Sequence, residues 1–139
     1  MQNIEQTRPV ADSANARAAT VLIVEDEPLP RLALSDFLQE KGFKVYEARS
    51  TKEAIGILEA PDAAIDAVFA DIQLPGVING LGLATWLRGK RPDIKIVMTS
   101  GYSGRAESVQ KTFWINAPFI EKPYDLAHVE RVLRKALDS

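Results

Sequence analysis

The chain has 139 residues, of which 46% are hydrophobic and 26% charged, which suits one globular domain with a continuous core and leaves no room for a second. Lys and Arg number 17 against 19 Asp and Glu, and no basic block is present, so we expect no nucleic-acid partner. Cysteine is absent, which excludes disulfides and thiolate metal sites.

Residues 1–19 are polar and small, without helical or strand periodicity, and they predict a disordered leader before a folded domain at residues 20–139. No signal-peptide core or membrane-spanning stretch occurs in this leader, so we expect a cytoplasmic protein without membrane contact. The initial Met1 and the leader favour an independent protein over a domain excised from a longer chain.

Beyond residue 20, short β-branched apolar runs alternate with amphipathic stretches, which is typical of βα units around a parallel sheet buried on both faces. Strands are expected at residues 21–24, 44–48, 67–70, 94–98 and 118–120, the second being nearer an edge because it is least apolar. Helices are expected at residues 28–41, 51–60, 81–90, 105–112 and 126–137. This order predicts an α/β fold, a doubly wound five-stranded parallel sheet.

Residues that typically cap the ends of helices stand at the expected helix ends. Gly42 can end the first helix, Ser50 with Glu53 three residues later can cap the second, and Asp125 can cap the last. Because crossovers between parallel strands are right-handed, the carboxyl ends of all strands lie on one edge, where open α/β folds carry their sites.

Acidic residues follow two of these strands. Glu25 and Asp26 come directly after the first, and Asp71 ends the third. Two carboxylates about 4 Å apart repel by roughly 4 kcal/mol at an effective dielectric near 20, so a cluster of three needs a cation or raised pKa values. Mg²⁺ or Mn²⁺ would satisfy the cluster and would accept phosphate oxygens in its remaining positions. The cluster therefore predicts phosphoryl chemistry.

The last two strands add a hydroxyl and a cation. The fourth ends in Thr99 and Ser100, and Lys122 follows the fifth. An aspartate accepts a phosphoryl group when a metal and a lysine hold the oxygens of that group. Asp71 is the best-placed acceptor.

Four segments, VEDE, ADIQLPG, MTSGY and FIEKPYD, resemble in order and spacing the receiver domain of bacterial two-component response regulators. The match covers nearly all of residues 20–137. The resemblance implies a (βα)5 flavodoxin-like fold with strand order 2-1-3-4-5, similar to the single-domain chemotaxis regulators. It also implies a phosphoacceptor switch rather than an enzyme, with only self-phosphotransfer and self-dephosphorylation expected.

The resemblance also implies roles for individual residues. Asp71 would be phosphorylated and would hold Mg²⁺ together with Glu25, Asp26 and the backbone carbonyl of Gln73. Lys122 would pair with the phosphoryl group.

Two further residues correspond to the family's switch, and a third has a structural role. Ser100, which precedes the small Gly101, would be the switch hydroxyl, and Phe119 the switch aromatic. Pro123 is expected to be cis. The chain departs from the commonest pattern by carrying Glu rather than Asp at position 25 and by a loop, LPGVINGLG, that is one residue longer.

The expected phosphodonor is a histidine kinase or a histidine phosphotransfer protein, and an unknown downstream protein would read the result. A homodimer formed on phosphorylation is also open, and no DNA-binding output domain is expected. Two alternatives remain. A Mg²⁺-dependent phosphohydrolase would need a general acid two residues after Asp71, where Gln73 stands; a docking scaffold would carry the same site without being phosphorylated.

Overall fold

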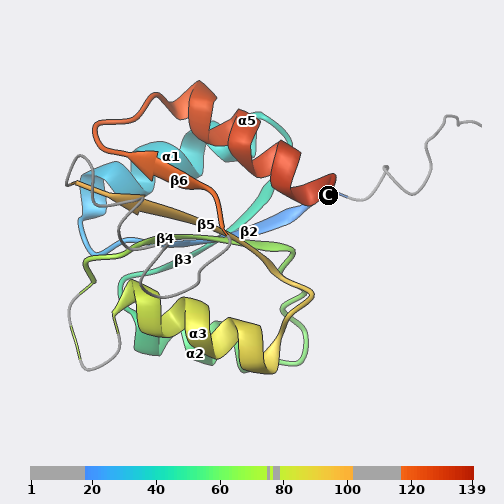
Figure 1. Cartoon of the computed structure of the whole chain (residues 1–139). Helices are drawn as coiled ribbons and strands as arrows, with labels where there is room; N and C mark the ends of the chain where they lie inside the picture. Colours follow the sequence, from blue (N-terminus) through green and yellow to red (C-terminus); the bar gives the residue numbers. More distant parts are fainter. Residues whose placement is uncertain (1–17, 75, 77–78, 102–116) are drawn as a thin grey trace, which may run out of the picture.

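The computed structural model describes residues 18–74, 76, 79–101 and 117–139 (Figure 1). Most of the expected leader and the whole of the helix expected at residues 105–112 lie outside the described residues. Among the described residues, no helix combines the length and the apolar character needed to cross a membrane.

The described elements alternate as the sequence predicts, and their bounds differ from the expected ones by two residues at most. They are β2 (Thr20–Val24), α1 (Pro28–Glu40), β3 (Lys44–Ala48), α2 (Thr51–Glu59), β4 (Ala67–Asp71), α3 (Gly80–Lys90), β5 (Lys95–Ser100), β6 (Phe119–Glu121) and α5 (Leu126–Leu137).

The five strands form one parallel sheet in the order β3-β2-β4-β5-β6, which confirms the predicted flavodoxin-like order. Helices α1 and α5 cover one face of the sheet, and α2 and α3 cover the other (Figure 1). Both faces of the central strands are therefore covered, and every residue of β2 and β4 is buried. This explains why these strands are continuous apolar runs rather than alternating ones.

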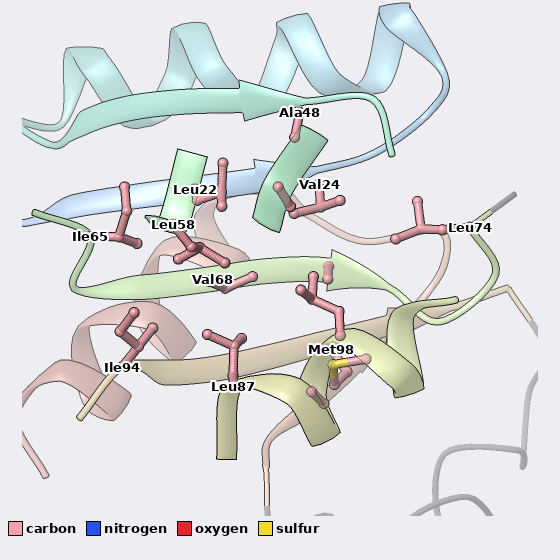
Figure 2. Packing of buried hydrophobic residues seen from close by; sticks show 14 of the residues in the cluster. Leu22, Val24, Ala48, Leu58, Ile65, Val68, Leu74, Leu87, Ile94 and Met98 are labelled. Carbon is pink, nitrogen blue, oxygen red and sulfur yellow. The ribbon is translucent and has the colours of Figure 1, made fainter. Parts of the chain in front are cut away.

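Alternate residues of each strand contribute to two separate cores. Leu22 and Val68 point toward α2 and α3, where they pack near Leu58 and Leu87 (Figure 2). The intervening residues of the strands pack against α1 and α5, as Ile23 does. The strand β3 lies at the edge of the sheet and is only partly buried, as its polar composition predicts.

The helix caps hold the expected positions. The side chain of Ser50 accepts a hydrogen bond from the Glu53 amide at 3.2 Å, and Asp125 Oδ1 accepts one from the Ala127 amide at 3.0 Å. Gly42, after α1, has a φ of 98°, a backbone conformation that glycine adopts without steric cost. These caps fix where the loops leave the sheet and return to it.

Candidate functional site

Four strands deliver the site residues to one edge of the sheet. Glu25 directly follows β2, Asp71 ends β4, Ser100 ends β5 and Lys122 directly follows β6. The register aligns Val24 with Ala70, so that Glu25 and Asp71 follow at the same level on neighbouring strands. The predicted convergence of these residues therefore results from the strand order.

Lys122 connects the two buried carboxylates. Its Nζ donates a hydrogen bond to Asp71 Oδ2 at 2.5 Å and another to Glu25 Oε1 at 3.3 Å. The side chains of Glu25 and Asp71 are only 4% and 6% exposed, whereas that of Lys122 is 27% exposed. A partly accessible cation thus compensates part of the negative charge of two carboxylates that would otherwise repel each other in a poorly solvated pocket.

The second oxygen of each carboxylate is held by a backbone amide. The amide of Gln73 donates to Asp71 Oδ1 at 2.9 Å, and the amide of Glu27 donates to Glu25 Oε2 at 3.1 Å. Each amide lies two residues after the carboxylate that it binds, so the turn after each strand fixes its own acid. Both side chains are therefore oriented before any ligand arrives.

Burial dominates the electrostatics of Glu25. Burial raises the pKa of the Glu25 carboxyl. The Glu27 amide and Lys122 lower this pKa and partly oppose the effect of burial. The Asp71 charge and a hydrogen bond with Asp26 raise it further. For Lys122, burial alone would lower the pKa, but the hydrogen bond to Asp71 and the charges of Asp71 and Glu25 outweigh burial and raise the pKa. Lys122 is thus held in its charged form.

The donor set fits a hard cation. Glu25, Asp26, Asp71 and the Gln73 carbonyl offer only oxygen atoms, which are the ligands that Mg²⁺ prefers. Asp26 and Gln73 are exposed at the mouth of the site, so solvent and ligands can reach them. In the described part of the chain, no three acidic or histidine side chains are gathered closely enough to enclose a metal ion. Because Lys122 contacts both Asp71 and Glu25, a cation bound by these carboxylates would share them with Lys122.

Both hydroxyl residues at the end of β5 are buried. The Thr99 hydroxyl donates to the Ile120 carbonyl at 2.7 Å and thereby ties β5 to β6. Ser100 is also buried, with 1% of its surface exposed, and its carbonyl accepts the Lys122 amide at 2.8 Å. The switch role of Ser100 stays a prediction.

The predicted switch aromatic, Phe119, and the expected cis proline, Pro123, also have defined positions. Phe119 is half-buried and packs against the core that faces α2 and α3. The peptide bond between Lys122 and Pro123 is cis, as the sequence predicts. The switch role of Phe119 stays a prediction.

Arg31, on α1, was not expected at the site. Its Nη1 donates to the Glu25 carbonyl and its Nε to Glu47 Oε1, both at 3.0 Å. Only 12% of its side chain is exposed. Sequence alone gives no signal for this contact, because Arg31 and Glu47 belong to different elements and are paired only by the fold.

Gly80, the first residue of α3, is a second unexpected contributor. A Cβ at this position would lie 2.1 Å from the Asp71 carbonyl oxygen and 2.7 Å from Ile72 Cα. The Gly80 amide donates to the Ile72 carbonyl at 3.1 Å. The start of α3 therefore packs directly on the backbone that carries Asp71.

An apolar groove of about 450 Å³ opens beside the charged pocket. Residues of α1 and of the turn before α5 line it, together with Lys122. Its lining comprises Glu27, Pro30, Ala33, Gly101, Lys122, Pro123, Tyr124 and Leu126. Two large apolar side chains of α1, Leu29 and Leu32, are 79% and 46% exposed. An apolar depression thus lies next to the site, and the helix that contributes to its lining also carries two exposed leucines.

Comparison with known proteins places the chain in a family. Residues 21–134 match the response regulator receiver domain, and the chain belongs to this family. Receiver domains are the phosphoacceptor signalling domains of two-component systems. The coarse function and the sheet topology predicted from the sequence are therefore confirmed.

Among curated proteins, the chain is similar to the sensor kinase CckA of Brucella abortus, with 34% identity over 87% of this chain and 13% of that protein. It is also similar to the nitrogen assimilation regulatory protein NtrX of Azorhizobium caulinodans, with 30% identity over 88% of this chain and 27% of that protein. The chain thus spans a small part of these two relatives.

Solved structures agree on the fold. A response regulator receiver protein from Sinorhizobium medicae has a TM-score of 0.79 and 27% identity, covering 89% of this chain and 98% of that one. The receiver domain of NtrX from Brucella abortus has a TM-score of 0.76 and 30% identity, covering 86% and 98%.

Proposed function

We propose that Asp71 accepts a phosphoryl group from a phosphohistidine of a histidine kinase or histidine phosphotransfer protein, and that protein contacts transmit the phosphorylated state. The observation that carries this proposal is the contact of Lys122 with both Asp71 and Glu25 at the sheet edge. An oriented carboxylate beside a partly accessible lysine is suited to receive an anionic phosphoryl group.

In the transfer step, the Asp71 carboxylate attacks phosphorus in line with the bond to the histidine nitrogen. The new P–O bond forms as the P–N bond breaks, and the electron pair of that bond stays on the leaving imidazole. The Gln73 amide keeps the Asp71 carboxylate in one orientation, and Lys122 compensates the charge of the phosphoryl oxygens. Glu25, Asp26, Asp71 and the Gln73 carbonyl would hold Mg²⁺ or Mn²⁺, which would supply further positive charge to these oxygens.

Phosphorylation then changes the balance of charges at the end of β5. It adds about −1.5 to −2 charge and new acceptor oxygens, which draw the Ser100 hydroxyl toward Asp71. Phe119, half-buried on the adjacent strand, fills the space that becomes available. A full shift from 1:99 to 99:1 needs about 5.5 kcal/mol of differential stabilisation, so phosphorylation biases two pre-existing arrangements.

The apolar groove suggests where the phosphodonor docks. It is lined by α1 residues and by Lys122 itself, so a partner seated there lies next to the acceptor carboxylate. The exposed Leu29 and Leu32 on the same helix favour a partner that presents an apolar helical face. A histidine on such a face would approach Asp71 from solvent.

Intact-mass measurement after incubation with acetyl phosphate and MgCl₂ tests the proposal. The wild-type chain should gain the mass of one phosphoryl group, and Asp71→Asn should gain none. No gain on the wild type would leave the docking scaffold as the better description. Sustained turnover of phosphate esters, lost in Asp71→Asn, would instead identify a phosphohydrolase.

A further inference from the structure

We infer that Arg31 is a positioning residue, which fixes the Glu25 peptide so that the Glu25 carboxylate faces Asp71 and Lys122. Arg31 does not touch either carboxylate of the pocket; it acts through the backbone carbonyl of Glu25. This inference rests on the proposed function, because it concerns how the phosphoacceptor pocket is assembled.

One backbone bond and the Arg31 side chain both tie the start of the loop after β2 to β3. The Glu25 amide donates to the Ala48 carbonyl at 3.0 Å, which holds the loop to the end of β3. The Arg31 side chain holds the carbonyl of the same residue and is itself fixed by Glu47, also on β3. Both ends of the Glu25 residue are therefore tied to the neighbouring strand.

Position 25 makes this anchoring necessary. Glu has one more rotatable bond than Asp, so the place of its carboxylate depends more strongly on how its backbone is held. The Glu25 carboxylate must reach both the Glu27 amide and Lys122. A guanidinium can hold two acceptors at once because its donors form a rigid fork, which a lysine ammonium lacks.

The sign of the effect on cation binding separates positioning from simple charge. Removal of a positive charge close to a cation site would relieve Coulomb repulsion, and this effect alone would strengthen Mg²⁺ binding. Loss of the group that orients a ligand weakens metal binding, typically by tenfold or more. The two explanations therefore predict opposite changes.

The test compares Mg²⁺ affinity in Arg31→Met and Arg134→Met by following backbone amide NMR shifts of residues 25, 71 and 122 as MgCl₂ is added. Arg134, on α5, is the matched control, because it also binds one carboxylate and one backbone carbonyl. These are Glu130 Oε2 at 3.0 Å and the Lys41 carbonyl at 2.8 Å, at the other end of α1. Methionine keeps the length of the arginine stem and removes only the donors.

We expect Arg31→Met to bind Mg²⁺ about tenfold more weakly than the wild type, and Arg134→Met to bind within about twofold. Urea unfolding without Mg²⁺ measures any general loss of stability in both variants. Should Arg31→Met fail to fold, Arg31→Lys, which retains the charge and only one of the two bonds, should still bind Mg²⁺ about threefold more weakly.

Equal or tighter Mg²⁺ binding by the Arg31 variant would overturn the inference, provided that the wild type binds Mg²⁺ and gains a phosphoryl group. If the wild type does neither, the proposed function itself fails. The two failures are thus distinguished by the wild-type sample alone.

Discussion

Replacement of Gly80 with alanine should destabilise the chain and slow phosphoryl uptake at Asp71. The added Cβ would lie 2.1 Å from the Asp71 carbonyl oxygen, whereas real Cβ contacts are essentially never shorter than 3.0 Å. Because the obstructing atoms are backbone, no side-chain rotation relieves the overlap. The start of α3 and the end of β4 must therefore separate by about 1 Å, at a cost of roughly 1 to 3 kcal/mol for overpacking.

Gly89 offers a matched control in the same helix. It lies near the end of α3, and a Cβ there would have no neighbour within 4 Å. Alanine at that position should stabilise the chain by about 0.5 to 1 kcal/mol, because glycine is unfavourable in a helix. The two substitutions are chemically the same and are predicted to have opposite signs.

Urea unfolding measures the free energy of unfolding of both variants, and intact mass at successive times after addition of acetyl phosphate measures phosphoryl uptake. A displacement of about 1 Å in an active site can reduce a rate by roughly a hundredfold. The reasoning would be refuted if Gly80→Ala were as stable as Gly89→Ala and took up phosphoryl groups at the wild-type rate.

Three further substitutions test individual contacts. Lys122→Met leaves two nearly buried carboxylates without their cation, so the free energy of unfolding in urea should fall by about 1 to 3 kcal/mol. This free energy should recover when MgCl₂ is added. Full stability of the variant without Mg²⁺ would contradict the pairing. Ser100→Ala should retain phosphoryl uptake by intact mass while weakening phosphorylation-dependent binding of the downstream partner; lost uptake with a normal response would contradict its switch role. Thr99→Val removes the buried hydrogen bond to the Ile120 carbonyl and should lower the free energy of unfolding in urea by about 1 to 3 kcal/mol, while phosphoryl uptake stays intact. Loss of phosphoryl uptake at full stability would show instead that Thr99 acts in the chemistry.

The sequence was sufficient to predict the sheet because its central strands are buried on both faces. The runs TVLIV and AVFAD are fully buried, and such continuous apolar runs between amphipathic helices indicate parallel strands. The ends of the strands were predicted less accurately than their centres. The strand β5 extends to Ser100, two residues beyond the expected end. Thr99 and Ser100 pair with β6 although both are polar.

The convergence of Glu25, Asp71 and Lys122 was also predictable, since it follows from the order and direction of the strands. The supporting contacts were not. Arg31 reaches Glu47 across sixteen positions of sequence, and only the packing of α1 on β3 brings them together. Gly80 lies against the Asp71 carbonyl only in the folded chain, and a glycine in the sequence does not reveal this contact. The Asn79 side chain, which caps α3 by accepting the Gly82 amide at 2.9 Å, was likewise not anticipated.

Mapping the modified residue after phosphorylation tests the central claim most directly. The chain is incubated with acetyl phosphate in the presence of either MgCl₂ or EDTA. The acyl phosphate is then reduced with borohydride, and the peptides are analysed by mass spectrometry. Asp62→Asn, which changes an exposed aspartate, is the control. We predict a reduced residue at position 71 alone, in the wild type and the control, and only with Mg²⁺. Labelling of another carboxylate, or equal labelling of Asp71 in EDTA, would contradict the account.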